Sequence, residues 1–408
     1  MKERVELTFR ALRSRNFRLF LFGQGISNMG SWMQRIALPW LVYEMTGSAG
    51  LLGIVGFSSY IPTVLLAPIA GVLIDRYSKL KIIKAAQFLE MLQALLLAFL
   101  VISGVAEIWH IIALSLFSGA IKAFEIPGRQ SFYIKLMDNK DDLPNAIALN
   151  SIVFHLSRFV GPSLAGFIIA ASSSGICFLI NGLSFIAVII SLYLIKVPEE
   201  ETQKGTTTIR EEIKEGINYV SSVPTLKNIL VLVAAISLFG WSYTILLPVF
   251  AKDVLGGGPL TFGFLNSATA VGAVIGAFYA ASRRDLSGLK KRTVFFAVIF
   301  GLAMILFSFS KELWLSLLFI GFVGLGAMLH NTSANSYIQT VVDDRQRGRV
   351  MSFYAFAHQG LMPVGSLILG WAASEYGAPI AMTTAGVFCL LTAAFLGPRI
   401  ALASEKQS

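Results

Sequence analysis

GVLIDRYSKLK, residues 71–81, is a charged break between two apolar runs of this chain, 50–74 and 82–104. Each run is long enough to cross a hydrocarbon layer, which takes roughly 20 apolar residues. Of all 408 residues, 55% are hydrophobic and 14% are charged, whereas soluble domains have roughly 25% charged residues. The composition therefore predicts an all-α membrane protein with short loops.

Further apolar runs lie on both sides of this break. The predicted spans are 17–44, 50–74, 82–104, 108–136, 143–170 and 175–197, followed by 226–250, 260–282, 293–309, 313–341, 350–373 and 378–397. We therefore predict twelve transmembrane helices in two six-helix halves, 1–197 and 226–408, joined by a cytoplasmic linker, 198–225. Within the linker, 209–220 has the spacing of an amphipathic helix; a solvated linker with no further role is the alternative.

Lys and Arg gather in alternate loops, and the loops on the opposite side hold only Lys252 and Lys311. Cytoplasmic loops are the basic ones in membrane proteins. Both termini and the linker are therefore predicted to be cytoplasmic.

The two halves carry a weak internal repeat. The matched residues are Gly53 with Gly263, Asp75 with Asp285, Lys81 with Lys291, Tyr133 with Tyr337, Gly161 with Gly365 and Gly166 with Gly370. The matches fall at corresponding topological places, which favours a duplication and pseudo-symmetric halves over coincidence.

The sequence lacks the signals that are typical of other classes of protein. The net charge of +10 is spread over many loops, whereas a nucleic-acid-binding domain gathers its basic residues on one face. Cys177 and Cys389 have no metal-ligand spacing, and no phosphate-binding loop or catalytic set is present. We therefore expect no metal, no cofactor, no enzyme activity and no direct use of ATP.

The break itself resembles the signature of the loop between spans two and three in the major facilitator superfamily. The resemblance implies a gate latch made by Gly71, Asp75, Arg76, Lys79 and Lys81, with Asp285 in the degenerate second copy. For the basic residues, charge that only sets the topology is the alternative.

Four further segments are similar to the bacterial exporter branch that contains enterobactin and macrolide efflux proteins: 124–130 (FEIPGRQ), 143–146 (LPNA), 161–166 (GPSLAG) and 347–352 (RGRVMS). This resemblance implies export of small amphipathic molecules, of the drug or siderophore class, across the inner membrane. Gly161, Pro162 and Gly166 resemble part of an antiporter motif whose upstream glycines are replaced here. Close helix packing alone is the alternative for these residues.

Five charged residues lie near the middle of predicted spans, all in the first half: Arg35, Glu90, Lys122, Glu125 and Arg158. Such residues are costly in a membrane and face a cavity or a partner. For Glu90, a buried pair with a basic residue is expected. Glu125 is either a switch that exchanges protons or part of a permanent ladder of ion pairs with Lys122 and Arg129, since helical spacing puts all three on one face.

In the family, spans one, four, seven and ten line the central cavity. The resemblance therefore predicts a substrate and proton site from Gln34, Arg35, Lys122, Glu125, Arg158, Trp241, Tyr243, His330, Asn331 and Asn335. The expected mechanism is alternating access, with proton antiport as the energy source. The expected partners are a small-molecule substrate, protons and the lipid bilayer, and one chain suffices as a monomer. Lipid or lysolipid transport and a receptor that transports nothing are the alternatives.

Overall fold

Backbone polar groups in a hydrocarbon layer must be satisfied within the protein, so long apolar segments fold as helices. The computed structural model describes residues 9–197, 209–283 and 288–401, and every regular element within these ranges is helical. The predicted all-α class is therefore confirmed.

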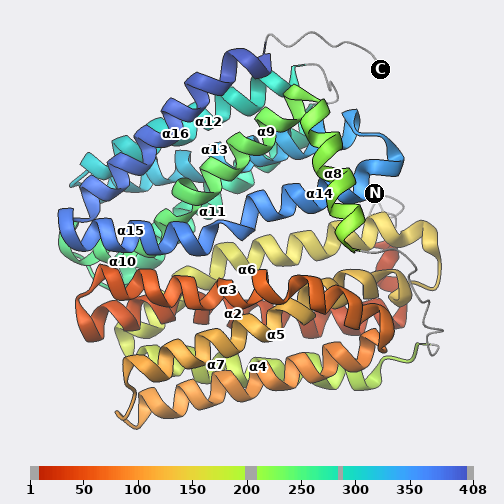
Figure 1. The fold of residues 1–408 in the computed structure, drawn as a ribbon. Helices are drawn as coiled ribbons and strands as arrows, with labels where there is room; N and C mark the ends of the chain where they lie inside the picture. Colours follow the sequence, from red (N-terminus) through yellow and green to blue (C-terminus); the bar gives the residue numbers. More distant parts are fainter. Residues whose placement is uncertain (1–8, 198–208, 284–287, 402–408) are drawn as a thin grey trace, which may run out of the picture. The chain divides into compact units, whose positions relative to one another are not determined.

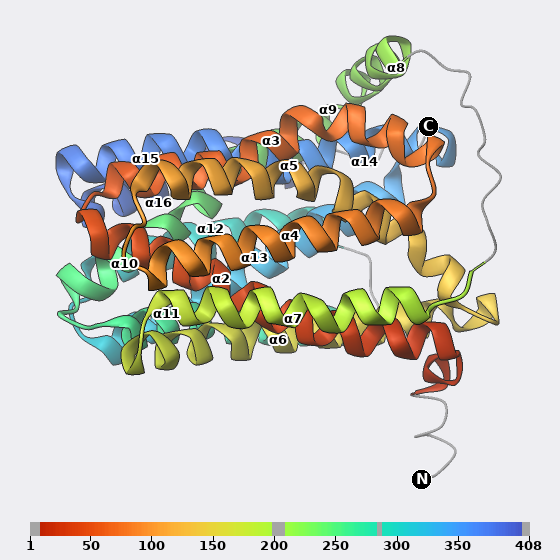
Figure 2. The ribbon, with the colours of Figure 1, turned by 90° about the horizontal axis from the view of Figure 1, so that it is seen from below.

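The first half of the chain forms six long helices after a short 3-10 helix, η1 (Arg10–Arg13). The long helices are α2 (Arg15–Thr46), α3 (Ala49–Arg76), α4 (Lys79–Ile102), α5 (Ile108–Phe132), α6 (Leu143–Ala171) and α7 (Ser174–Leu194). Two 3-10 turns, η2 (Tyr133–Leu136) and η3 (Lys140–Asp142), join α5 to α6. Helix α4 packs against α5 and α7, as Figure 2 shows.

The linker helix α8 (Ile209–Ser222) is followed by the six long helical runs of the second half. The first run consists of α9 (Pro224–Ala235), η4 (Ile236–Gly240), η5 (Trp241–Leu246), α10 (Leu247–Val249) and η6 (Phe250–Val254). The others are α11 (Pro259–Ser282), α12 (Leu289–Phe309), α13 (Leu313–Val341), the composite run of α14 (Asp344–Ala355), η7 (Phe356–Gly360) and α15 (Met362–Tyr376), and α16 (Ala378–Ala401).

These twelve runs match the twelve predicted spans. By length and composition, 10 helices of the structure qualify as membrane spans. The other two runs are α2, which contains several amide side chains besides its charged ones, and the composite run α14–η7–α15, which is interrupted at Leu361.

The chain divides into two compact units. Unit 1 comprises Met1–Val42 and Ser58–Gly205, and unit 2 comprises Tyr43–Phe57 and Thr206–Ser408. In unit 2, α13 packs against α11 and α12, and α12 packs against α16; helices α8 to α16 run from green to blue in Figure 1. The start of α3 belongs to unit 2 because Gly53 lets its backbone approach that of Gly370 closely.

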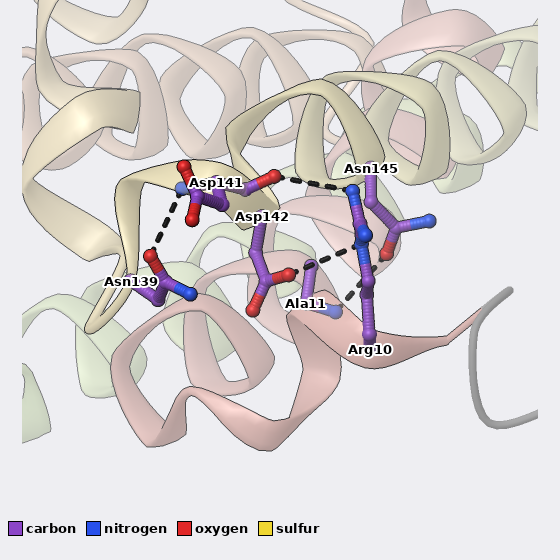
Figure 3. A network of polar contacts seen from close by, with 6 residues as sticks. All are labelled: Arg10, Ala11, Asn139, Asp141, Asp142 and Asn145. Atoms are coloured by element: carbon purple, nitrogen blue, oxygen red, sulfur yellow. Dashed lines mark hydrogen bonds and ion pairs between the residues drawn. The ribbon is translucent and has the colours of Figure 1, made fainter.

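The N-terminal η1 is fixed to the start of α6 by polar contacts (Figure 3). Arg10 Nε lies 3.1 Å from Asp142 Oδ1, and an Arg10 guanidinium N–H donates to the backbone carbonyl of Asp141 at 3.1 Å. The backbone N–H of Ala11 donates to Asn145 Oδ1 at 3.0 Å. These bonds hold the segment before α2 against the loop between α5 and α6.

Two spans of unit 2 are not regular α-helices. The run 224–254 contains the π-helical turns η4 and η6 and the 3-10 segment η5, and the run 344–376 contains the π-helical turn η7. The hydropathy pattern predicted both as uninterrupted spans, because a change of helix type does not alter which residues are apolar. Such turns occur frequently at functional sites.

The linker helix α8 docks on α14 within unit 2, beside which it lies in Figure 1. Arg349 Nη1 lies 2.6 Å from Glu215 Oε2, and the backbone N–H of Asp343 donates to the Tyr219 hydroxyl oxygen at 3.4 Å. Gly216 leaves room for the ring of Phe353.

Candidate functional site

The predicted cavity residues form two separate sets, one in each unit. In unit 1, Gln34 and Arg35 lie on α2, Lys122 and Glu125 on α5, and Arg158 on α6. In unit 2, the predicted residues lie in η5 (Trp241 and Tyr243) and on α13 (His330, Asn331 and Asn335).

Unit 1 contains a chain of amide hydrogen bonds through its interior. Asn181 Nδ2 donates to Gln34 Oε1 at 2.8 Å, and Gln34 Nε2 donates to Gln93 Oε1 at 3.0 Å. Gln93 Nε2 then donates to the backbone carbonyl of Leu114 at 3.4 Å. Because side-chain amides both donate and accept, this chain links α7, α2, α4 and α5 without any charge.

Glu125 forms an ion pair within its own helix. Its Oε1 lies 3.1 Å from Arg129 Nε, four residues further on, and accepts a hydrogen bond from Gln87 Nε2 at 3.3 Å. Among the described residues, Lys122 forms no ion pair with Glu125. Of the expected ladder, the structure therefore contains the rung between Glu125 and Arg129.

Glu90 has a different partner from the one expected. Its two carboxylate oxygens lie 3.0 and 3.1 Å from the Ser118 hydroxyl, and the described residues provide it with no ion pair. Ser118 lies one helical turn before Lys122 on α5, so a short hydroxyl side chain lies at the level of Glu90. The charges of Lys122 and Arg35 still act on this carboxylate from further away.

Two guanidinium groups lie over one aromatic ring in unit 1. The Cζ atoms of Arg35 and Arg158 lie 4.6 and 5.7 Å from the centre of the Trp32 ring. The ring of Phe154 meets the same indole edge to face, with centroids 5.7 Å apart. An aromatic face attracts cations, so Trp32 holds two fixed positive charges close together. Composition alone did not single out Trp32, which was missed.

In unit 2, His330 is fully buried on α13. Its Nδ1 lies 2.9 Å from the backbone carbonyl of Thr293. A carbonyl only accepts, so Nδ1 carries the hydrogen and Nε2 presents a lone pair. That Nε2 atom has no hydrogen-bond partner among the described residues.

A second histidine, His358 in η7, belongs to the same region. Its ring meets the ring of Trp241 edge to face at 5.4 Å and stacks on that of Tyr354 at 6.0 Å. The Tyr354 hydroxyl donates to the backbone carbonyl of Asn331 at 3.2 Å. His358 also lies close enough to His330 for their charges to interact.

This imidazole cluster, defined as Trp241, His330, Asn331, Tyr354 and His358, leaves buried polar atoms unsatisfied. Across the described residues, no partner is found for four of its atoms: Trp241 Nε1, His330 Nε2, Asn331 Oδ1 and His358 Nδ1. Such groups are destabilising, and each needs a specific reason to persist. A ligand that both donates and accepts hydrogen bonds would supply one. The irregular turns η5 and η7 bring Trp241 and His358 into this arrangement, which no sequence spacing reveals.

Two further predicted residues of unit 2 have contacts of their own. Tyr243 is buried with its ring 6.5 Å from that of Phe300. Asn335 accepts a hydrogen bond on its Oδ1 from Gln339 Nε2, one turn along α13.

The predicted gate-latch residues surround the turn from α3 to α4. Gly71 is exposed in α3, whose last two residues are Asp75 and Arg76, and Lys79 and Lys81 lie in the first turn of α4. The side chains of Asp75 and Arg76, and the whole of Asp285, lie outside the described part of the structure.

The antiporter-like residues lie in the middle of α6. Gly161 and Gly166 are buried, and Pro162 is inside the helix. A Cβ at Gly161 would come 2.7 Å from the Cβ of Trp32, so this glycine allows α6 to approach α2. Elsewhere, the described residues contain no group of three or more His, Cys, Asp or Glu that could hold a metal ion.

Comparisons with known proteins agree with this picture. The sequence model of a family described as transmembrane secretion effector matches residues 7–408. The staphyloferrin A transporter of Staphylococcus aureus is 28% identical over 86% of this chain and 87% of that protein. The multidrug efflux pump Tap of Mycolicibacterium fortuitum is 24% identical over 88% of this chain and 89% of the pump.

The fold also matches a solved transporter structure. A bacterial homologue of the human lysosomal transporter Spinster superimposes with a TM-score of 0.73 at 14% identity, over 95% of this chain and 98% of that one. Together with the family model, this confirms the expected major facilitator fold and the resemblance to bacterial exporters.

Proposed function

Since the chain belongs to the transmembrane secretion effector family of the major facilitator superfamily, we propose that it exports small amphipathic molecules by alternating access. The substrates are of the siderophore or drug class, and inward movement of protons supplies the energy. In this mechanism two halves rock about a site near the middle of the membrane. The relatives named as a siderophore transporter and a multidrug pump support this choice of substrates.

The observation that carries the proposal is the set of charged side chains held inside the spans of unit 1. Ionisable residues in such places mark substrate or proton pathways. Arg35, Lys122 and Arg158 outnumber Glu90 and Glu125 there, so the site suits an anionic or neutral amphiphile better than a lipophilic cation. The pair of guanidinium groups over Trp32 would bind an anionic group of the solute.

The imidazole cluster of unit 2 would offer a solute uncharged hydrogen bonds. Its four unsatisfied atoms include an obligate donor, Trp241 Nε1, and an obligate acceptor, Asn331 Oδ1. Hydroxyl and amide groups, which both donate and accept, complement such a set. The protein would act as a monomer in the inner membrane, with both termini in the cytoplasm, as the distribution of Lys and Arg favours.

Inverted membrane vesicles test this proposal. Vesicles containing the protein are given a labelled anionic catecholate or a labelled lipophilic cation, with and without a protonophore. Accumulation that the protonophore abolishes is expected for at least one solute, with the catecholate favoured. Vesicles from cells that lack the protein are the control.

If neither solute accumulates above this control, export of drugs or siderophores is rejected and lipid transport becomes the leading function. If accumulation persists with the protonophore, the export stands and the proton coupling is rejected.

A further inference from the structure

Two carboxylates lie inside the membrane-spanning helices of unit 1, and the structure surrounds them differently. Glu90 and Glu125 are almost equally buried, with 6% and 7% of their surfaces exposed. Glu125 has a guanidinium group 3.1 Å away, on Arg129. Glu90 has only the hydroxyl of Ser118 within hydrogen-bonding distance among the described residues.

The two partners differ in which protonation state they accept. A guanidinium group only donates hydrogen bonds, so Arg129 suits Glu125 as a carboxylate and provides no acceptor for the O–H of a carboxylic acid. A hydroxyl group donates and accepts, so Ser118 can donate to the Glu90 carboxylate and can accept a hydrogen bond from the Glu90 carboxylic acid. The surroundings of Glu90 therefore remain satisfied whether or not it carries a proton.

The charges around Glu90 allow both states. Lys122 and Glu125 act on it from α5, and Arg35 acts on it from α2. Helix α7, which also packs against α4, carries no charged side chain between Ser174 and Leu194. A buried carboxylate without a close cation is destabilised in its charged form, whereas the more distant cations Lys122 and Arg35 favour that form when water reaches the site.

We propose that Glu90, and not Glu125, is the residue of unit 1 that binds and releases the transported proton. This inference rests on the proposed proton-coupled export and assigns its proton site. The sequence alone pointed to Glu125, because Glu90 lies on a helix that usually flanks the cavity and because Ser118 lies on another helix.

Infrared spectroscopy of the full-length protein in liposomes tests this assignment without any solute. A protonated carboxyl group buried in the membrane has a carbonyl stretching band separate from those of carboxylates and amides. At neutral pH we expect this band in the unmodified protein, its loss in Glu90→Gln, and its retention in the matched variant Glu125→Gln. A band that survives in Glu90→Gln, or that disappears in Glu125→Gln, overturns the proposal.

Ser118→Ala provides a second test if Glu90→Gln does not fold. It removes the single hydrogen-bond partner, so the carbonyl band should move to higher frequency, and an unchanged frequency contradicts the assignment. The spectra test the proton site and the vesicle assay tests export, so each hypothesis can be rejected without the other. A band assigned to Glu90 in a protein that accumulates neither solute would reject export and keep the proton site, whereas export without the band would reject the site alone.

Discussion

Tyr43 donates a hydrogen bond from its hydroxyl to Oδ2 of Asp253, joining segments of unit 2 that are far apart in the sequence. Tyr43 lies near the end of α2, and Asp253 lies in η6. The ammonium group of Lys252 lies 5.7 Å from the centre of the Tyr43 ring. The end of the first span is therefore held to the end of the seventh by a hydrogen bond to a charged group and by a cation over the ring.

Tyr43→Phe should destabilise the protein, because it leaves the Asp253 carboxylate without this donor. Hydrogen bonds to charged groups contribute roughly 1.5–3 kcal/mol, so the apparent melting temperature in detergent should fall measurably. Tyr60→Phe is the matched control, since the described structure shows no hydrogen bond for that hydroxyl. Equal melting temperatures for the two variants would show that the Tyr43 bond contributes nothing to stability.

Arg129→Gln should destabilise unit 1 because it leaves Glu125 buried without its cation. Removing one member of a buried ion pair typically costs about 3–5 kcal/mol; Arg129 is partly accessible, with 22% of its side chain exposed, which favours the lower end. Unfolding of the single and double variants of Glu125→Gln and Arg129→Gln gives the coupling between the two residues.

The double variant should recover most of the stability lost in Arg129→Gln, because no unpaired charge is left buried. A double variant that is as unstable as the sum of the single variants would mean that the pair is not coupled.

The helices and some contacts could be predicted from the sequence, because they depend on residues that are close together along the chain. Apolar length determines the spans, and four-residue spacing brings Glu125 to Arg129 on one helix. The bond between Glu90 and Ser118 joins α4 to α5 and depends on how far each helix is rotated, which apolar periodicity does not specify. For the same reason, the sequence predicted His330 as a site residue without His358. The two histidines come together through the π-helical turn η7, which the sequence pattern does not reveal.

Trp241→Phe should weaken solute binding and leave the fold intact. The phenyl ring keeps an edge against His358, while the unsatisfied indole N–H is lost. Loss of one hydrogen bond should raise the solute concentration for half-maximal vesicle accumulation by roughly 3- to 10-fold. The melting temperature should stay unchanged. Unchanged accumulation in Trp241→Phe would exclude the indole N–H from the solute site.

Gly161→Ala should disturb the two guanidinium groups through the ring that they share. The new Cβ would come 2.7 Å from the Cβ of Trp32, and overpacking of this kind costs about 1–3 kcal/mol. Displacement of Trp32 moves the surface under Arg35 and Arg158, so accumulation of the catecholate should fall along with thermal stability.

Trp32→Phe separates these two effects. It removes the indole and leaves the backbone approach at Gly161 unchanged, so it should reduce catecholate accumulation with a smaller loss of stability. Full catecholate accumulation in both variants would mean that the guanidinium groups over Trp32 do not bind the solute.

The pH dependence of binding should report the charge of the solute through Glu90. Binding of a proton makes the cluster of Glu90, Lys122 and Arg35 more positive by one charge. An anionic solute should therefore bind more tightly as the pH falls and should take up a proton when it binds. A cationic solute should bind more tightly as the pH rises and should release a proton. Couplings between binding sites typically change affinity by roughly 5- to 150-fold.

A pH-indicator dye in weakly buffered detergent solution measures this exchange directly when the catecholate or the lipophilic cation is added. Glu90→Gln should remove the proton exchange and flatten the pH dependence of affinity, whereas Glu125→Gln should preserve both. Exchange that persists in Glu90→Gln would assign the proton to another group. A cation and a proton exclude one another at a single carboxylate, so proton release by a cationic solute would also explain antiport directly. Proton uptake by an anion would instead require the conformational cycle to enforce the exchange.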